Sequence, residues 1–261
     1  MNGVFYIGAT GLRAQQDALD TVANNIANVN TSNYKRATVS FSEVVGTPNV
    51  SASGRAIGGG GAMTNSGSVF HGVESQTAHR IFDPAPLAAN GNSMSLAIDG
   101  AGFIELASAD NRALLWRGGV FSVNADGYLS TATGVPLKAM ISVPRDASNI
   151  AISRDGEVTA VVADQVQHLG SIELVHVTDT GQLTETGSGH YRGPADGLEI
   201  SSGRPGAEGG ATIAQGFSEA SNVKLQDEMV SLLMLQRAYS ASAHVIQTGD
   251  DLMNIANQLK R

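Results

Sequence analysis

The sequence contains no cysteine, and this absence excludes disulfide bonds, thiolate metal sites and a cysteine nucleophile. Only 5% of its 261 residues are aromatic and only 15% are charged, whereas 31 are glycine. Such a chain has many turns and few bulky side chains to anchor a core. A run of about 18 apolar residues, the length that crosses a bilayer, is also missing, so we expect no direct membrane insertion.

Positive charge is scarce as well, because 24 acidic residues outnumber 16 basic ones and leave a net charge of −8. A chain of this sign lacks the attraction to phosphate that supplies most non-specific nucleic-acid binding, so nucleic acid is not an expected partner. The first residues include neither a basic region nor an apolar segment of signal-peptide length. We therefore expect either a cytosolic protein or one that is exported without a cleaved signal peptide.

Residues that are able to carry chemistry are scattered along the chain. No two of the six histidines have the spacing of four that places two imidazoles on one metal ion: His71, His79, His168, His176, His190 and His244. Asp99, Asp126 and Asp155 each precede a glycine, as tight turns require. The glycines at 58–61 are not followed by the Lys and Ser/Thr of a phosphate-binding loop. The sequence thus predicts no catalytic, cofactor-binding or metal-binding residue, and no cofactor.

Both ends of the chain have the heptad periodicity of an amphipathic helix. In residues 5–29 every seventh residue from Phe5 to Ile26 is apolar, and Asn, Ser and Thr then end the helix near 28–30. A second helix is expected from a cap at 221 or 222 to residue 259. The predicted assembly-interface residues on the two helices are Leu12, Leu19, Val22, Ile26, Leu225, Leu232, Leu235, Tyr239, Ile246 and Met253. Periodicity alone fits the inner face of a globular fold as well as it fits a contact between subunits.

The middle of the chain favours short β-strands that are separated by turns. Strands are expected at 95–98, 102–106, 113–116, 120–123, 128–131, 150–153, 157–162 and 172–177. The expected fold class is therefore α+β, with long N- and C-terminal helices paired as a coiled coil, an extended linker and a central all-β domain. The expected boundaries are 1–35 for the N-terminal helix, 36–70 for the linker, 71–200 for the β domain, 201–216 for a return linker and 217–261 for the C-terminal helix.

Three groups of motifs resemble the flagellar rod and hook protein family. They are TGLRAQQ at 10–16, ANNIANVNT at 23–31 and YKR at 34–36; LAIDGAGF at 96–103 and RGGVFS at 117–122; and EASNV at 219–223, EMV at 228–230, QRAY at 236–239 and VIQT at 245–248. They follow the order of the family over the whole chain. One departure is Asn33, where the family usually has glycine. Asparagine tolerates the left-handed backbone conformation, so we expect the turn to survive.

The resemblance implies a structural subunit that catalyses nothing and assembles helically with further copies into the hollow drive shaft between the flagellar motor and the hook. In its length and its β region, the chain looks most like the distal rod members of the family. A proximal rod or hook-side axial subunit is the alternative. The implied partners are proximal rod proteins, hook protein or hook-side axial proteins, the P ring and the L ring. The implied location is the basal-body rod in the periplasm, reached by type III export. From the residues alone, a secreted β-rich enzyme and a trimeric coiled-coil surface protein also stay open.

Overall fold

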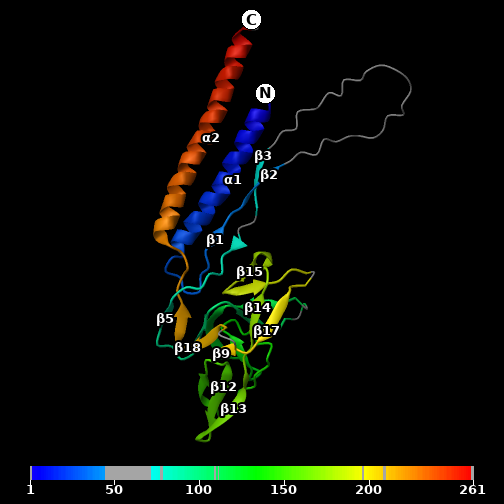
Figure 1. The fold of residues 1–261 in the computed structure, drawn as a ribbon, viewed down its shortest axis with the longest axis vertical. Coiled ribbons are helices and arrows are strands. Elements are labelled where there is room, and N and C mark those ends of the chain that lie inside the picture. Colours follow the sequence, from blue (N-terminus) through cyan, green and yellow to red (C-terminus); the bar gives the residue numbers. More distant parts are fainter. Residues whose placement is uncertain are drawn as a thin grey trace, which may run out of the picture. The chain divides into compact units, whose positions relative to one another are not determined.

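The chain folds as an α+β protein with a long helix at each end and β-strands between them (Figure 1). The computed structural model describes residues 2–44, 72–76, 79–108, 110, 112–195, 197–207 and 210–259. The described residues form two compact units. The helical unit takes those within 1–24, 38–78 and 226–261, and the β unit takes those within 25–37 and 79–225.

The helical unit is built mainly from α1 (Asn2–Ala27), α2 (Leu225–Leu259) and a ribbon of β2 (Phe41–Val44) paired with β3 (Gly72–Ser75). The two helices lie side by side (Figure 1). They run antiparallel, because Gly8 lies against Ile246 while Gln15, further along α1, donates a hydrogen bond to the earlier residue Ser242 at 3.1 Å. Backbone and hydroxyl groups of β3 bond to side chains of α1. Each element is too small to bury an apolar face by itself, and the unit therefore depends on this packing.

The β unit contains antiparallel sheets of different sizes. The largest has the order β15 (Thr184–Gly187), β16 (His190–Arg192), β8 (Leu114–Trp116), β7 (Phe103–Leu106), β14 (Leu174–Val177) and β17 (Ile200–Gly203). A second has the order β10 (Leu129–Thr131), β9 (Gly118–Val123), β6 (Ser95–Asp99) and β18 (Thr212–Gln215). The third has the order β11 (Ser148–Ile152), β12 (Glu157–Val162) and β13 (Gln165–Ser171). The remaining elements are β19 (Phe217–Glu219) paired with β5 (Leu87–Ala89), β1 (Ala37–Thr38) paired with β4 (His79–Arg80), and a short 3₁₀ helix at Thr180–Gln182.

The largest sheet is buried on both faces, because successive residues of a strand point to opposite sides. One face contributes Ile104, Trp116 and Leu174 to the main core, which also includes residues of the other two larger sheets. The opposite face forms a smaller cluster of Phe103, Leu115, Val175, Leu183 and Tyr191. Phe82 covers that cluster and meets the rings of Phe103 and Tyr191 edge-on at centroid distances of 5.0 and 4.9 Å. The sheet is therefore the rigid centre of the β unit.

The two outer strands of this sheet differ from its centre. All residues of β15 and of β17 are exposed. The pairing of β15 with β16 is also irregular, with a shift of register between Glu185 and Gly187. Both edges are thus short, and they consist almost entirely of polar residues and glycine.

The strands expected from the sequence are all present, as β6 to β12 and β14. The Asp-Gly turns are confirmed at Gly127 and Gly156, where φ is 82° and 81°, and Asn33 has the expected left-handed conformation with φ of 62°. The stretch 201–216, expected as a return linker, contains β18, whose Ile213 is fully buried in the main core. Of the expected linker at 36–70, residues 45–70 lie outside the described residues, and the part before them contains β1 and β2.

Candidate interaction surface

Small side chains are buried on α1, where Ala14, Ala18 and Val22 follow one another at helical spacing. At Gly8 the helix approaches α2 closely, because a Cβ atom added there would lie only 2.6 Å from Cγ1 of Ile246. That distance is shorter than a normal carbon–carbon contact, so the close approach of the helices requires glycine at this position.

The predicted assembly-interface residues lie on the packed sides of the two helices to different degrees. On α1, Val22 is buried, and half-buried residues are Leu12, Leu19 and Ile26. On α2, the half-buried residues share the side of the helix that carries Ser242, and they are Leu232, Leu235, Ile246 and Met253. Leu225 and Tyr239 are more exposed, at 44% and 40%. Gly8, which lies against Ile246, was not among the predicted residues, because a search for large apolar side chains ignores glycine.

A second apolar stripe lies on the side of α2 that faces away from α1. This outer face consists of Val230, Met234, Val245, Leu252 and Ile255, each more than half exposed. At 3.6 residues per turn these positions fall within about 80° of one another around the helix axis, on a different side from Ser242 and Ile246. Single exposed apolar residues are ordinary on a protein surface, but several of them along one side of a helix mark an interaction surface. Helix α2 is therefore apolar on two sides, and among the described residues only one of these sides packs against another element.

A buried cluster of charged residues lies in the β unit, and we call it the Glu219 centre. The Glu219 carboxylate accepts hydrogen bonds from Lys35 Nζ at 2.6 Å, from Arg117 Nε at 3.2 Å and from the Ala85 N–H at 2.9 Å. The three charged side chains are at most 1% exposed. Burial lowers the pKa of Lys35 below its ordinary value, and the hydrogen bond to Glu219 opposes that shift. The carboxylate thus compensates two cations that have lost their contact with water.

Asparagines of the N-terminal motifs organise the loop that follows α1. Asn25 is 1% exposed, and its side chain donates to the Ala37 carbonyl at 2.8 Å and accepts from the Ala37 N–H at 2.9 Å. Asn33 donates its N–H to the Glu219 carbonyl at 2.7 Å and accepts the Glu219 N–H on Oδ1 at 3.2 Å. The sequence indicated only a motif at Asn25 and a turn at Asn33, whereas in the structure both residues also bond to segments farther along the chain.

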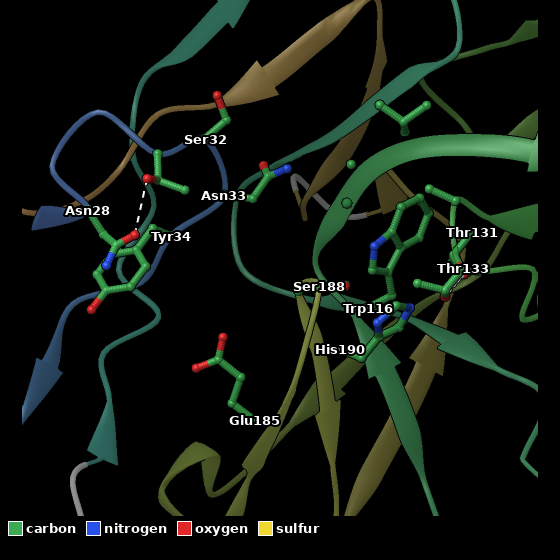
Figure 2. A pocket seen from close by; sticks show the side chains of 16 residues that line it. Asn28, Ser32, Asn33, Tyr34, Trp116, Thr131, Thr133, Glu185, Ser188 and His190 are labelled. Atoms are coloured by element: carbon green, nitrogen blue, oxygen red, sulfur yellow. Dashed lines mark hydrogen bonds between the residues drawn. The ribbon is translucent and has the colours of Figure 1, made fainter. Parts of the chain in front are cut away.

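Figure 2 shows a cavity of about 450 Å³ in the β unit, where the side chains of Trp116 and His190 lie side by side. These residues stand opposite each other on β8 and β16. His190 Nδ1 lies 3.0 Å from the Gly187 carbonyl and therefore carries the proton, while the buried Nε2 has no hydrogen-bond partner among the described residues. Glu185, which also lines the cavity, forms an ion pair with Arg80. Each of these two titratable side chains is thus bonded to a group that holds it in place.

In the part of the chain that the structure describes, no three His, Asp or Glu side chains come together in a way that would hold a metal ion. His71 is outside that part. Among the described helices, none combines the length and the sustained apolarity needed to cross a membrane. The surfaces that the geometry does provide are the helix pair, the outer face of α2 and the Glu219 centre.

Comparison with known proteins connects these parts of the chain with flagellar families. Residues 5–35 match the family described as flagella basal body rod protein, 97–160 match the D1 domain of flagellar hook protein FlgE/F/G, and 214–259 match the C-terminal region of flagellar basal body rod FlgEFG protein. The chain is similar to the flagellar basal-body rod protein FlgG of Borreliella burgdorferi, at 30% identity over 100% of both chains. It is also similar to FlgG of Agrobacterium fabrum, at 33% identity over 97% of both chains, and to FlgG of Bacillus subtilis, at 33% identity over 98% of both chains.

Proposed function

The chain belongs to the FlgG family of flagellar basal-body rod proteins and is a structural subunit of the distal rod, and we propose that its two terminal helices are the part through which it joins other subunits. The observation that carries this proposal is the outer face of α2. Five apolar side chains, from Val230 to Ile255, are more than half exposed along one side of a helix whose other side is already packed. Burying such a stripe between subunits removes apolar area from water and so favours assembly.

The arrangement of the helices supports separate roles for the two apolar sides of α2. We propose that α1 and α2 pair as a coiled coil, since Gly8 lies against Ile246 and Gln15 bonds to Ser242. Copies then assemble helically into a hollow shaft through these paired helices. In this arrangement Leu232, Leu235 and Ile246 act within the subunit, and the outer face of α2 acts between subunits.

The chain resides in the basal-body rod and assembles there with other axial proteins. We also propose which proteins the chain contacts in the basal body and how it is exported. Proximal rod proteins lie below it, hook or hook-side axial proteins lie above it, and the P and L rings surround it. It reaches the rod through the flagellum's own type III export apparatus without a cleaved signal peptide. The proposal also includes that the chain catalyses nothing and works only through its contacts.

One substitution on each side of α2 tests the proposed division. Leu252→Asp places a charge on the outer face, and Leu232→Asp places one on the side that packs within the chain. For Leu252→Asp we expect the free energy of unfolding of the monomer to stay within about 0.5 kcal/mol of the wild type, as for other surface substitutions. Tube formation, seen by electron microscopy of the concentrated protein, and swimming of cells that carry the variant should both be lost, because an unpaired carboxylate would be buried at each subunit contact.

The matched control is Asn254→Asp, which adds the same charge at an exposed polar position of the same helix. It should leave assembly and swimming intact. Leu232→Asp should instead reduce the amide protection of α1 in the monomer, since burying a leucine fully contributes about 1.5–3 kcal/mol. Normal tubes and normal swimming with Leu252→Asp would show that the outer face is not a subunit contact.

A further inference from the structure

Segments from four parts of the sequence meet at the Glu219 centre. The backbone of Asn33 bonds to Glu219, and the Arg36 N–H donates to Asn222 Oδ1 at 2.6 Å. Asn222 in turn donates to the Ile81 carbonyl at 2.8 Å. Segments 33–36, 80–85 and 219–222 are thus bonded to one another, and the Glu219 carboxylate joins them to Arg117, which follows β8 in the middle of the β unit.

The charges at this centre cannot be satisfied by the carbonyl groups around it. Arg117 also donates to the carbonyls of Gly102 and Gly100, both at 2.6 Å, and Lys35 also donates to the carbonyl of Asp83 at 2.9 Å. These acceptors satisfy N–H groups but carry no net charge. Removing one partner of a buried ion pair is far more costly than removing one from an exposed pair, because the remaining charge stays away from water. Among the described residues, Glu219 is the one carboxylate that bonds to both cations, and Asp83 favours the charged form of Lys35 only from a distance.

We propose that Glu219 is a folding latch: segments 33–36, 80–85 and 219–222 dock on the β unit in one cooperative step that requires its carboxylate. Segment 33–36 follows α1 and segment 219–222 precedes α2, so the latch fixes the connections to both helices at one place on the β unit. Without the carboxylate, Lys35 and Arg117 repel each other, and the segments detach together. This inference concerns the single chain and does not depend on the proposed assembly.

Amide hydrogen exchange of the full chain tests the latch. Asn33 and Arg36 report on the bonds of segment 33–36 to segment 219–222, and Ala85 reports on the bond of segment 80–85 to Glu219, because each donates its N–H to a partner in segment 219–222. In Glu219→Gln their protection should fall together, by on the order of a hundredfold to a thousandfold, the range expected for a broken buried ion pair. Ile172, whose N–H donates to the Gly156 carbonyl elsewhere in the β unit, should lose far less. The matched control is Glu105→Gln, which removes the carboxylate that pairs with the exposed Lys138 and should leave all of these amides unchanged.

Two results would overturn the latch. Loss of protection at Ala85 alone would show that the carboxylate acts only on its direct partner, and an equal loss at Ile172 would show a general effect on stability. The wild type provides a second test that stands even where Glu219→Gln does not fold. With increasing urea, the exchange of Asn33, Arg36 and Ala85 should merge into one opening reaction below the free energy of global unfolding. Separate opening reactions for the three amides would contradict a single cooperative step.

Discussion

The packing of α1 against α2 is most sharply tested by replacing single glycines of α1. Gly8→Ala improves helix propensity by about 1 kcal/mol. The new Cβ would lie 2.6 Å from Cγ1 and 3.0 Å from Cδ1 of Ile246, however, and such overpacking costs about 1–3 kcal/mol. At Gly11 the nearest atom to an added Cβ is Ser242 Oγ at 4.0 Å, an ordinary contact. Gly11→Ala should therefore stabilise α1, and Gly8→Ala should leave it unchanged or less stable.

The two alanine variants should thus differ by about 1–3 kcal/mol, which corresponds to roughly fivefold to 150-fold in the opening equilibrium of α1. Amide hydrogen exchange of α1 in the monomer measures this difference. A double-mutant cycle identifies its cause, because Ile246→Ala removes the atoms that Gly8→Ala would meet. In that background the loss caused by Gly8→Ala should disappear. Equal protection in Gly8→Ala and Gly11→Ala, or no relief by Ile246→Ala, would refute the close packing of the two helices at Gly8.

Three further predictions concern the β unit. Gly156→Ala should lower the free energy of unfolding more than Gly134→Ala does. The angle φ is positive at both glycines, at 81° and 84°, but an added Cβ collides with the Ile172 carbonyl at Gly156 and meets nothing within 4 Å at Gly134. Equal losses in urea unfolding would contradict the structure. Burial raises the pKa of Tyr191, so the unfolded chain loses this proton at a lower pH than the folded chain does, and stability should fall with rising pH above about 10. Tyr191→Phe should flatten that fall by up to about 1.4 kcal/mol per pH unit, and an unchanged pH dependence would count against the burial of the hydroxyl. Asn25→Ala should lower the free energy of unfolding by about 1–3 kcal/mol, because it leaves the buried N–H and carbonyl of Ala37 without their partner. Urea unfolding with no such loss would contradict the geometry at Asn25.

Local signals in the sequence made the central strands predictable. Alternating side chains and Asp-Gly turns, such as those before Gly127 and Gly156, involve residues that are close together in the chain. Several strands were not expected, among them β18 and β19. The stretch 201–216 that contains β18 is rich in Gly and Ser, and the partners of β18 and β19, which are β6 and β5, lie far earlier. Pairing over such a distance leaves no periodic trace in the later strand.

The candidate interaction surfaces could also be predicted only in part from the sequence. Heptad spacing predicted both helices, but α2 is apolar on two sides, and periodicity does not tell which side packs within the chain. The Glu219 centre was invisible in the sequence for a different reason. Charged residues are normally exposed, and Lys35 and Glu219 are 184 positions apart, so only the fold reveals that they compensate each other.

The exposed edges of the largest sheet have a consequence for a protein that works at high local concentration. Free strand edges of neighbouring copies are able to pair with one another and produce disordered aggregates. Here β15 and β17 have four residues each, both end in glycine, and β15 also breaks register beside Gly187. Irregular edges of this kind are poor templates for a further strand. Neighbouring subunits in the rod are thereby kept from pairing through these sheet edges, and ordered contacts between subunits must use other surfaces.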